Sequence, residues 1–479
     1  MSGVRGIRMP RGAVSLAALG VVAALAAALS LRIPFRAWPE VLVPSYLFGR
    51  GWLLYRDIKI VHAPLLIGAV AAVSRTVGLN ETTLRVAGFL PVAAILATLR
   101  RHGARYGWGI GAQTAAQLVF VLTFFAWDGN AIYPEVFLAV LAVPIYAALR
   151  RGGDAGVRLA GWLFGVALAI KQPAVFAFLL ASIGIALQER RRLLSFILRA
   201  GAVPAACLLA FLAAGEGADF LRWTIEVPLA FYRGRTSLGI QPAQAPAVLV
   251  GALPLLAWIV FARRHREGRG PAFLLPGLTL AFAMPAFPHF EMVHLVAAVP
   301  LLAVAAGEVV AEGAPRGGVR GGAAPAGSGD GRREALPAVA GAVAVGVSVL
   351  LNAAFLATDT SAGEMSFWSS KPDEAALARL SALPPAPLFL YGADQNLFVR
   401  SGRVPPGHLY SNPDLWVHYL VDDLERKQVR ILQDHPETIV LRGPGTPIET
   451  PRRLLPAYLA ALDASEEFVP GWIRRLRLR

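Results

Sequence analysis

The 479-residue sequence is poor in charge, since Asp, Glu, Lys and Arg make up only 16% of it, against about a quarter in a soluble domain. It also contains a single cysteine, Cys207, so no intramolecular disulfide can form. Hydrophobic residues make up 56%, and the mean hydropathy is +0.54. These values exclude a soluble cytosolic enzyme. The apolar residues come in runs comparable to the about 20 residues of a membrane-spanning helix, which excludes a porin-type barrel as well.

Lysine is scarce too, because only four of the 46 basic residues are lysine. The net charge of +15 and the isoelectric point near 10.6 would suggest nucleic acid as a partner in a soluble protein. In a chain this apolar, arginines first report which side of a membrane each loop occupies. We therefore expect no nucleic-acid partner. The glycines of residues 312–335 follow no strand and open no helix, so this segment is interpreted as a cytoplasmic linker rather than a phosphate-binding loop.

The apolar runs predict an α-helical polytopic membrane protein with about eleven spans. The first run follows three arginines and is interpreted as an uncleaved anchor, with a cleaved signal peptide as the alternative. Two paired runs are short enough to require tilt or local thinning of the bilayer. The predicted spans are residues 13–33, 84–99, 109–126, 131–149, 157–170, 174–187, 195–214, 245–262, 271–287, 292–311 and 336–357.

The segment 63–78 is short, contains Arg75 and decides the predicted topology. If it lies along the outer surface, every tight arginine cluster that follows falls on the cytoplasmic side, as the positive-inside rule requires. Counting it as a span would put most of those clusters outside. We therefore predict a surface helix here, a cytoplasmic N-terminus and an external C-terminus, in the inner membrane of a bacterium.

This topology divides the chain into two predicted domains. Residues 1–357 form a membrane domain, whose first outer loop, 34–83, contains surface helices; a further outer loop covers about 215–244. Residues 358–479 form a small α/β domain on the periplasmic side. Within it we expect strands at 387–393, 437–443 and 467–478 and helices at 413–433 and 452–463.

The first outer loop is the richest in chemistry, because acids, bases, aromatics and glycines alternate directly before the surface helix. Ionisable residues of a membrane enzyme are expected at the interface, since charges inside lipid are costly. A carboxylate for proton abstraction and cations for a phosphate could both be held here. The residues concerned are Glu40, Asp57, Lys59 and His62.

These motifs resemble those of the GT-C membrane glycosyltransferases. An acid after the first span is followed by Gly-x-x-x-Tyr-Arg-Asp, ending at Asp57, and by an x-Pro-Leu surface helix. Further matches are Gly161, Gly165, Lys171 and Gln172, and the run from Phe287 to Pro300. The resemblance covers roughly residues 10 to 400. It includes the protein mannosyltransferases, the aminoarabinose lipid A transferases and the lipopolysaccharide-core group called RgtA/B/C/D-like.

The resemblance implies that an acid in the first outer loop deprotonates the acceptor hydroxyl. Carried over, this base falls on Glu40, although Pro39 stands where the family commonly has an aspartate. Asp57 is the rival. The structural alternatives are a pair between Glu40 and Arg36 and a pair between Asp57 and Arg56 or Lys59.

The resemblance also implies cations for a lipid phosphate. The candidates are Lys59, His62 and Lys171, beside Gln172, with Arg233 and Arg235 as additions from the later outer loop. Lys171 could instead extend its ammonium from the end of a short span, and the two arginines could simply be solvated.

A second acidic region follows the third span. Asp128 could orient the acceptor, hold a divalent metal with Glu40, or serve as the N-cap of the next helix. Glu135 lies inside a predicted span and needs a partner, so we expect it to face the protein interior. His289 and His294, with Glu291 between them, have the wrong spacing for a zinc pair on one helix face, and His294 is expected to contact substrate by resemblance. No cofactor is assigned, and a divalent metal stays open.

We therefore expect a glycosyltransferase that moves a sugar from a polyprenyl-phosphate donor in the membrane to an external glycan, lipid or protein acceptor. The alternatives are a transporter of lipid-linked sugars, which would predict inverted repeats that the sequence lacks, and an inactive relative acting as a binding subunit.

Overall fold

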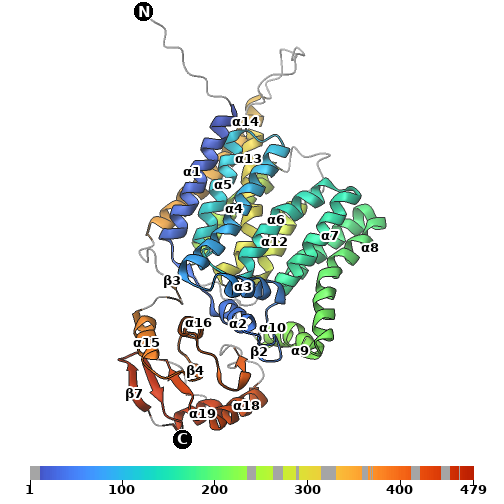
Figure 1. Cartoon of the computed structure of the whole chain (residues 1–479). Coiled ribbons are helices and arrows are strands. Elements are labelled where there is room, and N and C mark those ends of the chain that lie inside the picture. The colour runs from blue at the N-terminus through green and yellow to red at the C-terminus, as the bar shows by residue number, and fades with distance from the viewer. Residues whose placement is uncertain are drawn as a thin grey trace, which may run out of the picture.

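The computed structural model describes residues 11–234, 244–262, 273–286, 291–313, 331–358, 365–366, 368, 371–411, 421–443, 454–462 and 464–478. Most of them form a bundle of long helices (Figure 1). The bundle helices are α1 (Arg11–Arg32), α4 (Glu81–Arg105), α5 (Ile110–Ala126), α6 (Pro134–Arg151), α7 (Gly153–Ile170), α8 (Val175–Ala213), α11 (Ala245–Ala257), α12 (Leu274–Ala283), α13 (Val299–Gly313) and α14 (Gly331–Thr358). Short 3₁₀- or π-helical segments extend some of them. The 3₁₀ segments are η1 (Gln172–Ala174), η5 (Met284–Ala286) and η6 (Met292–Ala298), and the π segment is η3 (Trp258–Ala262).

In the described part of the chain, five helical stretches are long and apolar enough to cross a membrane. They are Glu81–Arg105, Gly153–Ile170, Gln172–Ala213, Met292–Glu312 and Val339–Thr358. Shorter apolar helices coincide with the runs 13–33, 109–126, 245–262 and 271–287, and the run 131–149 coincides with α6, which carries Glu135, Arg150 and Arg151. The number of eleven spans therefore stays a prediction. The predicted linker at 312–335 lies mostly outside the described residues, and α14 already begins at Gly331.

Helix α8 contains two of the predicted spans. They are separated by a break at Glu189, where the backbone leaves helical geometry with φ −142° and ψ 50°. The Glu189 carboxylate accepts the Gly153 N–H at 3.3 Å, and Arg192 pairs with Asp154 at 2.5 Å. The predicted runs 174–187 and 195–214 are the two halves on either side of this break.

Two glycines allow the second half of α8 to approach α7 closely. A Cβ at Gly161 would lie 2.9 Å from the Phe196 carbonyl oxygen, and one at Gly165 would lie 3.1 Å from that of Ala200. Small residues four apart commonly permit such approaches between membrane helices. The Gly-x-x-x-Gly part of the sequence motif is therefore a packing feature.

Two short helices, α2 (Pro39–Gly49) and α3 (Pro64–Thr76), lie across one end of the bundle (Figure 1). The Arg75 guanidinium ties them together by donating to the Gly49 carbonyl at 2.6 Å. The segment predicted as a surface helix is thus a helix of 13 residues outside the bundle. Helix α9 (Gly217–Leu221), the π-helical segment η2 (Arg222–Glu226) and α10 (Val227–Gly234) lie at the same end of the bundle as α2 and α3 (Figure 1).

Beyond α2, the C-terminal residues form a four-stranded sheet with helices around it (Figure 1). The strand order is β4 (Leu388–Tyr391), β6 (Ile439–Arg442), β8 (Ile473–Leu476) and β7 (Ala464–Val469), with β4 and β6 parallel and the other neighbours antiparallel. The helices are α15 (Lys371–Ser381), α16 (Leu397–Ser401), η7 (Pro406–His408), α18 (Val421–Asp434) and α19 (Leu454–Ala460).

The single final strand expected at 467–478 is wrong, because the structure has a hairpin there. Pro470 and Gly471 separate β7 from β8, and Gly471 has a φ of +70°, which glycine adopts without steric cost. The Trp472 N–H closes the turn on the Val469 carbonyl at 2.9 Å. The other expected strands and helices are present, although residues 412–420 of the expected helix lie outside the described residues.

Two short parallel ladders join the first outer loop to this C-terminal unit. β1 (Phe35–Arg36) pairs with β3 (Met365–Ser366), and β2 (Ile58–Lys59) pairs with β5 (Tyr410–Ser411). The Trp52 ring also stacks on His408 with centroids 4.7 Å apart. The loop that contains Glu40 is therefore held between the bundle and the C-terminal sheet.

Gly161→Ala should destabilise the bundle by about 1–3 kcal/mol, because the added methyl group would meet a backbone oxygen that cannot move without separating α7 from α8. Gly201→Ala is the matched control, since a Cβ there meets nothing within 4 Å and alanine favours the helix by about 0.5–1 kcal/mol. Thermal unfolding in detergent measures both. Equal midpoints for the two variants would contradict the close contact.

Asp394→Asn should stabilise the full-length protein at pH 8 and not at pH 4. Burial, reinforced by the charge of Asp373, raises the pKa of Asp394 from 3.8 to about 7. An acid with a raised pKa favours folding when protonated, and this contribution is lost as the pH rises from 3.8 through 7. Asparagine stays neutral throughout. Thermal midpoints at the two pH values test this, with Glu437→Gln as control: hydrogen bonds from its own backbone N–H and from His435 lower the pKa of Glu437, so no gain is expected at pH 8.

Candidate active site

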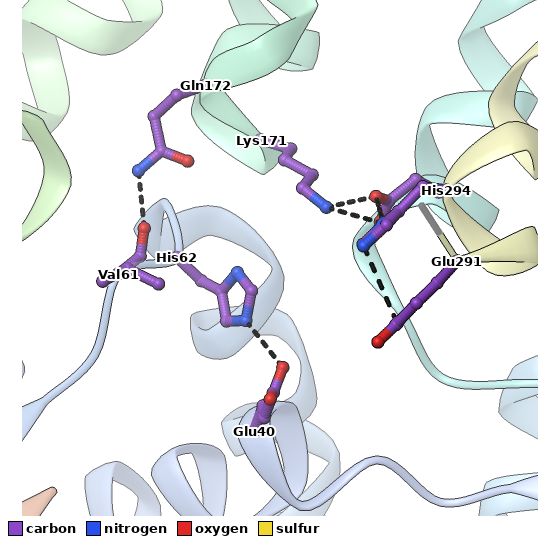
Figure 2. Close-up of polar contacts among 8 residues, drawn as sticks. Glu40, Val61, His62, Lys171, Gln172, Glu291 and His294 are labelled. Carbon is purple, nitrogen blue, oxygen red and sulfur yellow. Dashed lines mark hydrogen bonds and ion pairs between the residues drawn. The ribbon is translucent and has the colours of Figure 1, made fainter. Parts of the chain in front are cut away.

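Glu40 and His62 meet at the end of the bundle covered by α2 and α3. Pro39 occupies the first position of α2, where its missing N–H costs nothing, and Glu40 lies in the first helical turn near the positive end of the helix dipole. His62 precedes α3, which also begins with a proline, Pro64. The His62 Nε2 lies 3.6 Å from the Glu40 Oε2, as Figure 2 shows.

A buried cluster of Glu135, Lys171 and His294 lies beside this pair. Glu135, in the first turn of α6, is fully buried, and one of its oxygens contacts both the Lys171 ammonium and the His294 Nδ1. The prediction that Glu135 faces the interior with a partner is confirmed. The His294 Nε2 lies 3.7 Å from Glu291, a carboxylate that is about a third exposed (Figure 2).

The aromatic ring of Tyr133 connects the pair and the cluster. Its centroid lies 6.2 Å from that of His62, 5.7 Å from that of His294 and 5.1 Å from the Lys171 ammonium. Trp38 packs on the same ring at 5.2 Å. Glu40, His62, Lys171 and His294 therefore belong to one site. The sequence does not predict the central position of Tyr133. The one available signal is that Tyr133 lies two residues before Glu135, a residue expected to face the interior.

Gln172 holds the loop of His62 in place. Its Nε2 donates to the Val61 carbonyl at 2.7 Å and to the Thr224 carbonyl at 3.1 Å (Figure 2 shows the first). One side chain at the α7–α8 turn therefore ties the first outer loop to η2.

Asp57 is part of a tight turn. One carboxylate oxygen accepts the Leu53 N–H at 2.9 Å and the other accepts from the Arg56 guanidinium at 3.1 Å. The structural alternative expected from the sequence, a pair with Arg56, is confirmed. The Asp57 carbonyl also accepts the Tyr410 N–H at 2.8 Å, so this turn anchors the C-terminal unit.

Lys59 points to a different set of partners from Lys171. Its ammonium donates to the Tyr55 carbonyl at 2.7 Å, lies 3.6 Å from Asp219 and stands over the Trp223 ring at 5.7 Å. Burial lowers the pKa of Lys59, and the nearby charge of Lys427 lowers it further, while Asp219 opposes both. The structure thus sets Lys59 beside α9, η2 and α18, whereas His62 faces Glu40.

Asp128 pairs with Arg36, which donates to it from two nitrogens at 2.8 and 3.0 Å. The structural alternative of a pair between Glu40 and Arg36 is therefore wrong, because Arg36 is directed to the turn between α5 and α6. The alternative of Asp128 as an N-cap is also wrong, since Tyr133 precedes the first residue of α6. Asp128 instead occupies a left-handed turn with φ +60°, which aspartate tolerates better than most residues.

The remaining candidates are described only in part. Arg233 lies in α10, but its side chain is outside the described residues, as are Arg235 and His289 altogether. Within the part of the chain that the structure covers, no three His, Cys, Asp or Glu side chains are grouped to hold a metal ion. A divalent metal held by Asp128 and Glu40 therefore stays a prediction.

The fold of this chain is that of the GT-C membrane glycosyltransferases, which confirms the predicted resemblance at the level of fold. Together with its apolar helices, this makes it a membrane-bound protein. No family model matches the sequence, and no curated protein matches it either.

Particular solved structures share this fold over almost the whole chain. ArnT from Cupriavidus metallidurans bound to undecaprenyl phosphate is 15% identical, with 98% of both chains covered and a TM-score of 0.60; its apo state gives 14% and 0.59. The archaeal oligosaccharyltransferase AglB from Archaeoglobus fulgidus, in complex with an inhibitory peptide and a dolichol-phosphate, is 12% identical with a TM-score of 0.50, covering 90% of this chain and 69% of its own.

Glu135→Gln should destabilise the protein by about 3–5 kcal/mol, because it leaves the buried Lys171 ammonium without its counter-charge. The double variant Glu135→Gln/Lys171→Met should recover most of this loss. Glu81→Gln breaks an exposed pair with Arg85 and should cost at most about 1 kcal/mol. Thermal unfolding compares the three, and a stable single variant would argue against a buried ion pair.

Proposed function

We propose that this protein is a glycosyltransferase that moves a sugar from a polyprenyl-phosphate donor to an extracytoplasmic glycan, lipid or protein acceptor. The observation that carries the proposal is the Glu40–His62 pair beside the buried Lys171 cluster, at one end of an ArnT-like bundle. The ArnT structure was solved with undecaprenyl phosphate, which supports a lipid-linked donor of the same chemistry here.

Glu40 is the proposed general base. Its carboxylate takes the proton of the acceptor hydroxyl as that oxygen attacks the anomeric carbon, and the bond from this carbon to the donor phosphate breaks with inversion. The leaving group is the polyprenyl phosphate. His62 orients the carboxylate, and the 3.6 Å between them supports this role. Asp57 is the weaker candidate, because both of its oxygens already accept hydrogen bonds of its own turn.

The donor phosphate is proposed to lie near Lys171 and His294. The ammonium has three N–H donors, of which Glu135 engages one, so a phosphate oxygen can take another. Because Glu135 already balances the charge of Lys171, further cations are needed, and Arg233 and Arg235 from the later outer loop are the proposed source. Gln172 keeps His62 in place. Burial of Lys171 and His294 limits water near the donor carbon and so disfavours hydrolysis.

Lys59 and Asp128 are proposed to act from the edges of this site. Lys59 lies where α9 and α18 meet the first outer loop, a position suited to an anionic group of the acceptor or donor. Asp128 fixes Arg36, four residues before Glu40, and so supports the base.

The proposed orientation places this end of the bundle on the periplasmic face of a bacterial inner membrane, with the N-terminus in the cytoplasm. In its support, Arg105 and Arg150 lie at the ends of α4 and α6 opposite to the candidate site, and Arg192 lies at the break in α8 near Asp154. Arginine-rich loops remain preferentially on the cytoplasmic side.

The purified protein should transfer sugar from at least one labelled polyprenyl-phosphate sugar to an external acceptor. Glu40→Gln should reduce the rate by about 10²–10⁴-fold, because the amide cannot accept the proton. Asp57→Asn, which keeps the oxygen that accepts the Leu53 N–H, should retain most of it. Scintillation counting of the product measures all three proteins after thermal unfolding has shown equal stability.

The opposite pattern would reassign the base to Asp57. Full activity of both variants would remove a loop carboxylate from the mechanism, and no transfer by the wild type from any donor would overturn the proposed function.

A further inference from the structure

Asn396, in the C-terminal unit, reaches the loop that contains Glu40. It stands immediately before α16, at the N-cap, where asparagine commonly binds the first free N–H groups of the helix. Here the side chain makes no such bond. Its Nδ2 instead donates to the Ala37 carbonyl at 2.6 Å, across 359 positions of sequence.

Contacts within the C-terminal unit fix the position of Asn396. The residue is 1% exposed, and its backbone N–H donates to the Asp394 carboxylate at 2.8 Å. The next two residues, Leu397 and Phe398, are buried in the core. Few rotamers are open to a side chain held in this way, so the amide is directed at Ala37 by the surrounding packing.

The Ala37 carbonyl, which accepts this hydrogen bond, lies in a segment that two other parts of the chain also bind. Phe35 and Arg36 pair with Met365 and Ser366, and the Arg36 N–H donates to the Asn130 carbonyl at 2.8 Å. Ala37 itself is fully buried. Asn396 is the side chain that extends this support by one residue towards the base.

Only Trp38 and Pro39 separate Ala37 from Glu40. The proline fixes its own φ, and the N–H groups of Val41 and Leu42 both donate to the Trp38 carbonyl at 3.2 Å. Because the backbone between Ala37 and Glu40 has little conformational freedom, a displacement of the Ala37 peptide also displaces the first turn of α2. It therefore shifts Glu40 relative to His62.

We propose that Asn396 is a positioning residue, which holds the first turn of α2 so that Glu40 meets His62 and the acceptor hydroxyl. The inference rests on the proposed function, in which Glu40 is the base. In this inference the C-terminal unit contributes to catalysis by binding the Ala37 carbonyl, without contacting the substrate. Misplacement of a catalytic group by about 1 Å costs on the order of 10²-fold in rate.

Asn396→Asp tests this, because it nearly preserves volume and removes the side-chain N–H that Ala37 accepts. Tyr46→Phe is the matched control, since it removes another single hydrogen bond between α2 and the C-terminal unit, from the Tyr46 hydroxyl to the Arg403 carbonyl at 3.4 Å. Both full-length variants are compared with the wild type by amide hydrogen exchange of the peptide covering residues 37–42 and by kcat and KM for the donor.

In Asn396→Asp we expect faster exchange in this peptide, a kcat lowered by about 10–100-fold and a KM within twofold of the wild type. In Tyr46→Phe all three quantities should stay within twofold. If Asn396→Asp does not fold, Asn396→Ala removes the donor without adding a charge.

Unchanged exchange in the Asn396 variants overturns the inference, as does an unchanged kcat or an equal loss in Tyr46→Phe. A wild type that transfers no sugar defeats the proposed function instead. The exchange comparison then still decides whether Asn396 holds the first turn of α2.

Discussion

The buried carboxylate of Glu135 is the constraint on which the candidate site depends. A fully buried acid is costly unless a cation and hydrogen bonds compensate it, and here Lys171 and His294 both converge on one of its oxygens. These residues come from α6, the end of α7 and η6, so satisfying one charge fixes three elements against each other. Tyr133, directly before α6, then lies between this cluster and His62. The Tyr133 ring therefore sets His62, and with it the partly exposed Glu40, against this buried arrangement.

The first outer loop gains its rigidity from two directions. From the bundle, Gln172 binds the Val61 carbonyl and Asn130 receives the Arg36 N–H. From the C-terminal unit, two short ladders and Asn396 bind the same loop. A loop with little secondary structure of its own can in this way hold a carboxylate in a defined place, which general base catalysis requires. The two candidate acids of this loop therefore differ in their surroundings: Glu40 faces His62, and Asp57 closes a turn.

Much of the fold could be predicted because its signals are local. Apolar runs coincide with helices, the arginine distribution separated 63–78 from the bundle, and Glu135 in an apolar run implied an interior partner. Local signals also misled. The alternation in 467–478 hid a Pro470–Gly471 turn, and an aspartate before a helix suggested a cap at Asp128, although the helix begins six residues later. The charge of Lys171 indicates a phosphate-binding residue, but only the structure shows that Glu135, 36 residues earlier, already pairs with it.

The sequence by itself determined a membrane-bound helical protein with a small C-terminal α/β unit and a loop at 34–83 rich in acids and bases, because hydropathy and turn residues act over a few neighbouring positions. Only the tertiary structure decided which charges meet. Arg36 pairs with Asp128 rather than Glu40, Glu40 with His62, and Asn396 with a carbonyl 359 residues away. Such partners are set by the packing of helices distant in the chain, since a charge removed from water pairs with whatever the fold brings within reach.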